Sequence, residues 1–423
     1  MHVNAHLDLD VVAIEQADEV TLMLELDAPP APDSGPRAPA AVQIVLDRSG
    51  SMGGERLDAA KDAIVALVDR LDPTDSLGVV AFDNEVQMVL PTRTLDGPNR
   101  KAAKDAVARL LPGGMTNLSG GLLRGLQEAR RAAGDGQGGA TLILLSDGHA
   151  NEGETDPGVL SRVAAGARDQ GITTSTVGIG LGYDELLLSE VAGGGQGNHV
   201  FAEQGDAAAA AVAGEVDGLL SKTVQAASLL IRPAGSVESV TVWNDLPGNP
   251  VPGGIMVELG DLWASEQRKL VLTFKVPAMT ALGLAEIAQL ELRYVTLPAF
   301  VEQTITVPVH VNVVPGDQAA GRIPDAKVRT ELVYQQVQEE KRRAAEALRE
   351  GDLRKAQNAY DEARRRLAEQ MEACPTPELV EESEVINTLR HRADVGDVMW
   401  SAKSAMMDRH YKSRKRGRRG PEV

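Results

Sequence analysis

The 423-residue chain contains a single cysteine, Cys374, so it cannot form an internal disulfide bond. Aromatic residues make up only 3% of the sequence, and the cores must therefore rest on Val, Leu, Ile and Ala. No apolar run approaches the roughly 20 residues that a membrane-spanning helix requires. The N-terminus also lacks the basic start and the apolar stretch of a signal peptide. These absences predict a cytoplasmic protein that makes no membrane contact.

Positive charges are fewer than negative charges. The sequence contains 43 Lys and Arg residues and 61 Asp and Glu residues, so the net charge is −18. Such a charge repels nucleic acid and anionic lipid, so we expect the body of the molecule to bind neither. The exception is a basic run near the C-terminus. It comprises Lys412, Arg414, Lys415, Arg416, Arg418 and Arg419. A run of this kind is typical of a solvated tail, with nucleic-acid or partner contact as the alternative.

The chain lacks the motifs of common nucleotide-dependent and hydrolytic enzymes. No Gly-x-x-x-x-Gly-Lys-Ser/Thr segment is present, and neither Ser49 nor Ser119 lies in a Gly-x-Ser-x-Gly elbow. Glycines at 178, 180 and 182 lack the full spacing of a dinucleotide-binding loop and follow a late strand, so we interpret them as a strand-to-helix turn. We therefore expect no enzymatic activity.

Hydropathy patterning divides the sequence into an α/β segment with β structure on both sides. Short continuous apolar strands alternate with amphipathic helices over residues 42–222, which is typical of a parallel sheet covered on both faces. Period-two alternation in residues 2–26 and 237–313 indicates antiparallel strands. We predict a doubly wound, mostly parallel α/β domain inserted into a discontinuous antiparallel β-sandwich domain.

Charged helical sequence follows the β region. Residues 325–349 and 353–371, separated by a Glu-Gly-Asp turn, predict an antiparallel helical hairpin; only one tetratricopeptide-like unit is present, too few for an array. A short amphipathic stretch near 385–407 precedes the basic run. The predicted boundaries are 1–36 for the first β strands, 40–223 for the α/β domain, 224–316 for the rest of the β-sandwich, 320–373 for the hairpin and 374–423 for the C-terminal segment.

Three loops of the α/β domain carry oxygen-bearing side chains near strand ends. Asp47, Ser49 and Ser51 follow the first strand, Thr116 lies just before a helix, and Asp147 ends another central strand. Ligands of open α/β sheets bind at the carboxyl ends of the strands, so we expect these loops to converge. Two carboxylates and three hydroxyls suit a hard cation. So compact a set favours Mg²⁺, with Mn²⁺ or Ca²⁺ as alternatives.

The pattern Asp47-x-Ser49-x-Ser51, Thr116 and Asp147 resembles the metal-ion-dependent adhesion site of the von Willebrand factor type A family. The resemblance covers about residues 42–222. It implies that the three hydroxyls bind the ion directly and that the two aspartates act directly or through water. It also implies one coordination position left for a carboxylate. The implied function is Mg²⁺-dependent binding of a protein partner that supplies a Glu or Asp.

The same residues also allow other functions. The chain is alternatively a non-catalytic subunit of an ATPase-driven, chelatase-like or assembly complex, or a domain whose ion only holds the loops. An acid–base role for Asp47 and Asp147 is disfavoured, because hydroxyls and a cation would hold both ionised. Metal-assisted hydrolysis would need a base beside the ion, and none stands out. We expect Arg48, Met52, Met115 and His149 to surround the site and add affinity. His149 is equally well read as a surface group.

Overall fold

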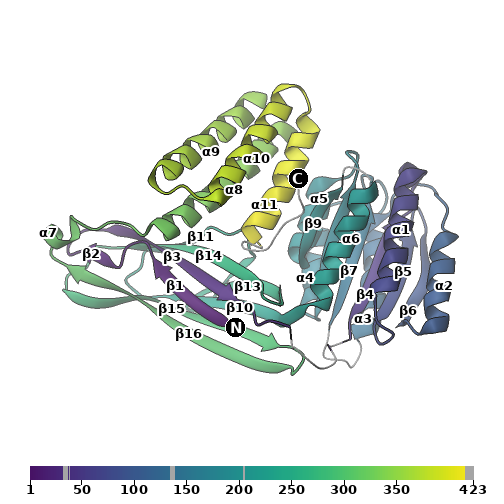
Figure 1. Cartoon of the computed structure of the whole chain (residues 1–423), viewed down its shortest axis with the longest axis horizontal. Helices are drawn as coiled ribbons and strands as arrows, with labels where there is room; N and C mark the ends of the chain where they lie inside the picture. The colour runs from purple at the N-terminus through teal and green to yellow at the C-terminus, as the bar shows by residue number, and fades with distance from the viewer. Residues whose placement is uncertain (32–36, 38, 134–138, 203–204, 415–423) are drawn as a thin grey trace. The chain divides into compact units, whose positions relative to one another are not determined.

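The computed structural model describes residues 1–31, 37, 39–133, 139–202 and 205–414. The chain forms two compact units, which are drawn together in Figure 1. One consists of Met1–Ala31 and Thr223–Val423, and the other of Pro32–Lys222. No helix of the described residues is long and apolar enough to cross a membrane.

The second unit is built on a six-stranded sheet in the order β6-β5-β4-β7-β8-β9. All neighbouring strands are parallel except β5 and β6. The strands are β4 (Ala41–Asp47), β5 (Ser76–Phe82), β6 (Val86–Thr94), β7 (Ala140–Ser146), β8 (Ile172–Ile179) and β9 (Gln196–Ala202). Strands β4 and β7 are buried along their whole length, as continuous apolar strands of a covered parallel sheet should be. They lie side by side in the centre, so their carboxyl ends meet at one edge.

Helices cover both faces of this sheet. The helical elements are η1 (Gly50–Met52), α1 (Glu55–Arg70), α2 (Gly97–Ala108), α3 (Leu118–Ala133), α4 (Pro157–Arg168), α5 (Glu185–Gly194) and α6 (Gly205–Leu220). Helices α1, α2 and α6 share one apolar core with the strands, and the other three pack on the opposite face. Helix α1 buries Leu57, Ala60, Ile64, Leu67 and Val68 at helical spacing. A buried apolar stripe of this kind makes the helix amphipathic, as the sequence pattern predicts.

Local capping residues fix where several of these helices begin. The carboxylates of Asp96, Asp156 and Asp184 each accept a hydrogen bond from the backbone N–H three residues further on. A cap of this type stabilises a helix by about 1 kcal/mol. Helices lie between the strands as the sequence pattern predicts, whereas the strand β6 was not predicted. It is an edge strand that buries little besides Leu90, so its sequence carries no strong alternation.

The first unit contains two sheets that share one apolar core. Their orders are β1-β3-β14-β11 and β12-β13-β10-β15-β16-β2. The strands are β1 (His2–Leu7), β2 (Val11–Ala13), β3 (Asp18–Asp27), β10 (Lys222–Pro233), β11 (Ser239–Val242), β12 (Gly248–Val251), β13 (Gly254–Trp263), β14 (Gln267–Val276), β15 (Gly283–Thr296) and β16 (Val301–Val314). Strand β3 pairs with β14 along ten residues, so the chain's first strands complete a sheet made after the α/β segment. The predicted fold class is confirmed.

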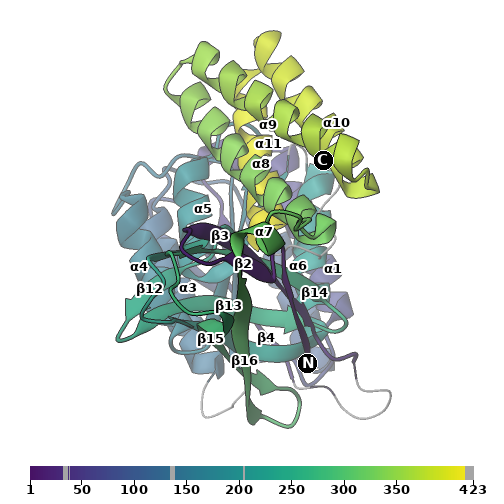
Figure 2. The same ribbon diagram turned by 90° about the vertical axis from the view of Figure 1, so that its left-hand side faces the viewer.

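Four long helices follow the second β region, where only a hairpin and a short amphipathic stretch were predicted. After the short α7 (Gly316–Ala319) come α8 (Ala326–Arg349), α9 (Leu353–Ala373), α10 (Pro377–Asp394) and α11 (Val398–Arg414). Figure 2 shows them gathered into one bundle. The sequence analysis underestimated the helical content of this region. Helix α11 buries polar side chains such as Lys403, Asp408 and His410, so its buried face does not stand out as an apolar pattern.

Buried ion pairs connect these helices. Lys341 of α8 contacts both Glu382 of α10 and Asp408 of α11, and all three side chains are almost completely buried. Lys412 adds contacts to Glu382 at 2.7 Å and to Asp408 at 3.0 Å. Although burial raises it, the two lysines lower the pKa of Glu382 to about 2. Lys412 is therefore part of this buried group of ion pairs, although the sequence predicted that it lies in a solvated basic run.

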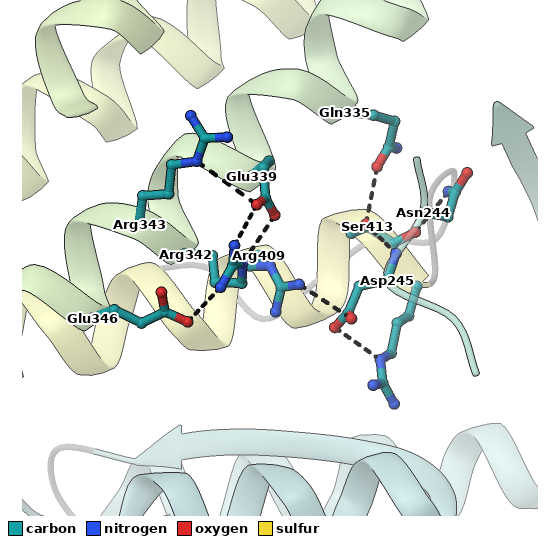
Figure 3. A network of polar contacts seen from close by, with 10 residues as sticks. Asn244, Asp245, Gln335, Glu339, Arg342, Arg343, Glu346, Arg409 and Ser413 are labelled. Carbon is teal, nitrogen blue, oxygen red and sulfur yellow. Dashed lines mark hydrogen bonds and ion pairs between the residues drawn. The ribbon is translucent and has the colours of Figure 1, made fainter. Parts of the chain in front are cut away.

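Helix α11 also binds the loop between β11 and β12 (Figure 3). The Asn244 amide donates to the Ser413 carbonyl at 2.7 Å, and Arg409 and Arg414 contact Asp245 at 3.1 and 3.2 Å. Burial raises the pKa of Asp245, but the two guanidinium groups hold it well below its usual range. The solvated-tail prediction is therefore wrong for Arg414 as well as Lys412. Its other residues, Lys415, Arg416, Arg418 and Arg419, lie outside the described residues.

Candidate metal centre

The carboxylate of Asp47 lies at the carboxyl end of β4 and is completely buried. Its Oδ1 accepts a hydrogen bond from the Ser49 backbone N–H at 2.8 Å, and its Oδ2 accepts one from the Ser146 hydroxyl at 2.5 Å. Burial nevertheless raises the pKa of Asp47 to about 6, helped by the nearby Asp147 and opposed by these hydrogen bonds. In the absence of a cation, these hydrogen bonds thus do not offset the effect of burial on the pKa of Asp47.

The two serines of the first loop connect Asp47 to the second aspartate. The Ser49 and Ser51 hydroxyl oxygens lie 3.1 Å apart, and the Ser51 hydroxyl donates to Asp147 Oδ1 at 2.7 Å. Ser49 and Asp147 are buried, whereas Ser51 is exposed. The group of oxygens is therefore accessible from solvent on the Ser51 side.

Thr116 joins the same group through the space beside Gly148. A Cβ atom placed on Gly148 would lie 3.3 Å from the Thr116 hydroxyl oxygen, 3.4 Å from that of Ser51 and 3.9 Å from Asp47 Oδ2. Side chains from two loops therefore border one small space beside Gly148, which lies on the third loop, and a methyl group would fill that space. The structure brings all five predicted residues together.

Glycines allow the loop that carries Thr116 to approach the sheet. A Cβ atom on Gly113 would lie 1.8 Å from Asp83 Oδ2, and one on Gly114 would lie 2.2 Å from Asn84 Oδ1. Backbone bonds fasten the loop: Gly113 N–H donates to the Arg48 carbonyl at 2.6 Å, and Gly50 N–H donates to the Gly114 carbonyl at 2.9 Å. The loops that carry Ser49 and Thr116 are thus held to each other.

Several contributors to the site were not found from the sequence. Ser146 binds Asp47, and Asn151 holds the Thr116 backbone, accepting from its N–H at 2.9 Å and donating to its carbonyl at 3.2 Å. Arg56, on the first turn of α1, contacts Asp147 Oδ2 at 2.5 Å. Ser146 could have been predicted, because it precedes the predicted ligand Asp147 at the end of a strand. Arg56 depends on how α1 is rotated, and no sequence signal reports that.

The expected surroundings of the site are only partly observed. Met52 is completely buried in the core beneath α1, so its expected place at the surface is wrong. Arg48 is 19% exposed and contacts Asp83 at 3.2 Å. Met115 is 52% exposed, and the His149 side chain is 67% exposed and 3.7 Å from Asp184. Met115 and His149 are therefore available to a bound partner.

The donor set fits a hard divalent ion. Within the described parts of the chain, no group of three or more His, Cys, Asp or Glu side chains is placed to hold a metal. The converging atoms are instead two carboxylates and three hydroxyls, all oxygen, which suit Mg²⁺, Mn²⁺ or Ca²⁺ better than softer metals. The small space beside Gly148 is bordered by the Thr116 and Ser51 hydroxyls and by the buried Asp47 carboxylate, all of which are oxygen donors.

The family model for the von Willebrand factor type A domain matches residues 42–212. This segment is a von Willebrand factor type A domain. The chain is 30% identical over 275 residues to an uncharacterised protein of Synechocystis sp., an alignment that covers 62% of this chain and 63% of that protein. It is 38% identical over 122 residues to an inter-alpha-trypsin inhibitor heavy chain of Mesocricetus auratus, covering 27% and 13%. The chain thus spans less than two thirds of these curated relatives.

Two solved structures share the fold of the whole chain, including the regions outside the type A domain. A von Willebrand factor type A protein from Catenulispora acidiphila aligns with a TM-score of 0.75 and 18% identity, over 98% of this chain and 96% of that one. The ArnB paralog VWA2 from Sulfolobus acidocaldarius aligns with a TM-score of 0.63 and 16% identity, over 97% and 98%. At these identities the likeness shows a common architecture.

Proposed function

We propose that the von Willebrand factor type A domain binds an acidic side chain of a protein partner through a divalent metal ion. Domains of this family mediate protein interactions, and some do so with a bound metal. The observation that carries the proposal is the convergence of Asp47, Ser51 and Thr116 beside Gly148. Ser49 and Asp147 belong to the same group through their contacts with the Ser51 hydroxyl. The exposed Ser51 provides access from solvent.

The hydroxyls of Ser49, Ser51 and Thr116 would hold the ion, with the two aspartates acting directly or through water. When bound, the ion would supply a positive centre that attracts a carboxylate. We propose Mg²⁺ as the physiological ion, with Mn²⁺ or Ca²⁺ as substitutes, because the set is compact and has few carboxylates. Met115 and His149 would contact the partner and exclude water, which strengthens an electrostatic contact that is weak in bulk solvent.

We propose a binding role rather than a catalytic one. One relative that is 30% identical over 260 residues is named an E3 ubiquitin-protein ligase, and others are inter-alpha-trypsin inhibitor heavy chains. Asp47 is hydrogen-bonded to Ser49 and Ser146, and Asp147 to Ser51 and Arg56. Neither carboxylate is placed as a free base toward a substrate.

A retention experiment tests the proposal. The full chain is immobilised and exposed to native extract with Mg²⁺ or with EDTA, and the same is done with Asp47→Ala, Thr116→Ala and the control Thr94→Ala, which removes an exposed hydroxyl at the end of β6. We expect proteins that are retained by the wild type and Thr94→Ala only with Mg²⁺, and by neither site variant. Equal retention by all variants in both buffers would show that binding does not use the metal centre.

A further inference from the structure

Arg56 occupies the outer side of the candidate metal centre. Its guanidinium contacts Asp147 Oδ2 at 2.5 Å and lies 3.4 Å from the Ser51 carbonyl oxygen. Asp147 Oδ1 accepts from the Ser51 hydroxyl, so the two oxygens of Asp147 face different partners. The Asp147 side chain is buried, while that of Arg56 is 44% exposed. A permanent positive charge is thus bonded to a residue that we propose as a metal ligand.

Gly180 provides the room that Arg56 needs. A Cβ atom on Gly180 would lie 3.2 Å from one guanidinium nitrogen and 3.4 Å from the guanidinium carbon. Gly180 has a φ of +70°, which side chains other than glycine rarely adopt. The glycine-rich turn after β8, which lacks the full spacing of a dinucleotide-binding loop, therefore lies against the guanidinium group.

The charge of the centre follows from these contacts. The two ionised aspartates and Arg56 give the group a formal charge of −1, since the neighbouring Arg48 is already paired with Asp83. A divalent ion would change this charge to +1, and one carboxylate from outside would then neutralise it. Without Arg56, the ion alone would already neutralise the group. Arg56 therefore weakens binding of the ion alone, because both are positively charged. It favours binding of the ion together with an outside carboxylate, because the charges of that group then cancel.

We propose that Arg56 is a counter-charge that weakens binding of the metal ion alone and couples its retention to an acidic ligand. This inference rests on the proposed function and identifies the residue that links its two binding events. The coupling is reciprocal, so a carboxylate must tighten metal binding by the same factor as the metal tightens carboxylate binding.

The sign of one substitution separates this role from a merely structural one. If Arg56 only held Asp147 in position, Arg56→Gln would weaken metal binding. If Arg56 is a counter-charge, Arg56→Gln removes a positive charge that only the Asp147 carboxylate separates from the ion. The substitution should then tighten binding of Mn²⁺ roughly tenfold or more. Arg56→Lys retains the charge and should stay close to the wild type.

The experiment is a calorimetric titration of Mn²⁺ into the EDTA-treated, dialysed full chain. The variants are Arg56→Gln, Arg56→Lys and Ser51→Ala, the last of which locates the binding site. Arg70→Gln is the matched control, because Arg70 lies on the same helix, is 46% exposed and pairs with Asp217 at 3.2 Å. We expect it to leave the Mn²⁺ affinity unchanged. Each titration is repeated with acetate and with its uncharged analogue acetamide, with the Mn²⁺–acetate association in buffer subtracted.

The outcomes separate the inference from the function on which it rests. Tighter Mn²⁺ binding by Arg56→Gln, with a smaller gain from acetate than in the wild type, supports the counter-charge role. Unchanged or weaker binding by Arg56→Gln, while the wild type binds Mn²⁺ and Ser51→Ala does not, overturns that role and leaves the metal centre standing. Absence of Mn²⁺ binding by both the wild type and Arg56→Gln overturns the proposed function and the inference together.

Discussion

Replacing Asp47 by Asn should stabilise the metal-free protein, although it removes a residue of the candidate site. In the folded chain the pKa of Asp47 is raised from 3.8 to about 6 by burial, so its ionised form is disfavoured. A shift of that size corresponds to about 3 kcal/mol at neutral pH. Altered hydrogen bonds with Ser49 and Ser146 reduce the gain. We expect a net stabilisation of about 2 kcal/mol, or roughly 4–8 °C in the melting temperature of this unit.

The pH dependence follows from the same shift. Because the folded-state pKa of Asp47 is raised, folding takes up a proton between about pH 6 and 3.8. The stability of the wild type therefore gains from this group as the pH falls through 6, and the advantage of Asp47→Asn disappears near pH 4. At neutral pH, Mn²⁺ should raise the melting temperature of the wild type and leave that of the variant nearly unchanged.

Thermal unfolding followed by circular dichroism, in EDTA and in Mn²⁺, measures these effects. Asp75→Asn is the matched control of opposite sign. Asp75 is equally buried in the same unit, but hydrogen bonds from Arg37 and from the backbone of Ala40 and Asp72 lower its pKa despite burial. Its replacement should destabilise the protein in both buffers. A lower melting temperature for Asp47→Asn in EDTA would refute the reasoning that hydrogen bonds compensate the buried charge of Asp47 only in part.

Three further substitutions test other parts of the structure. Gly113→Ala places a Cβ atom on Asp83 and should displace the Thr116 loop, so Mn²⁺ titration should show at least about tenfold weaker binding; unchanged affinity would contradict the close approach. Lys341→Met leaves Glu382 and Asp408 with less compensation and should cost about 3–5 kcal/mol in urea unfolding, whereas a neutral effect would show that the cluster is solvated. Asp245→Asn loses its pairs with Arg409 and Arg414; hydrogen exchange should show faster opening at the end of α11, and unchanged protection would argue against that anchor.

The sequence predicts those features of the fold that depend on continuous patterns. Strands β4 and β7 are apolar along their length, so their place in the centre of a covered sheet follows directly, and the edge where Asp47 and Asp147 meet follows from parallel pairing. The same patterns do not predict strand β6 or the full extent of helix α11. An edge strand buries few residues, and α11 buries charged side chains whose partners, such as Lys341 and Glu382, are distant in sequence.

In the candidate site, too, some features follow from sequence patterns and others do not. Its five predicted residues lie in loops whose positions the strand order determines, and this allowed their convergence to be foreseen. The supporting contacts depend on local geometry instead. Arg56 reaches Asp147 only because α1 is rotated toward it and Gly180 leaves space, and Met52 is buried because η1 turns its side chain into the core.

Anomalous X-ray scattering from a crystal of the full chain grown in Mn²⁺ tests the central claim most directly. We predict one strong peak beside Gly148, bounded by the hydroxyls of Ser49, Ser51 and Thr116, with water or a carboxylate from outside the chain at an open position. A peak elsewhere, or an ion at that place fully enclosed by the chain's own atoms, would contradict the account.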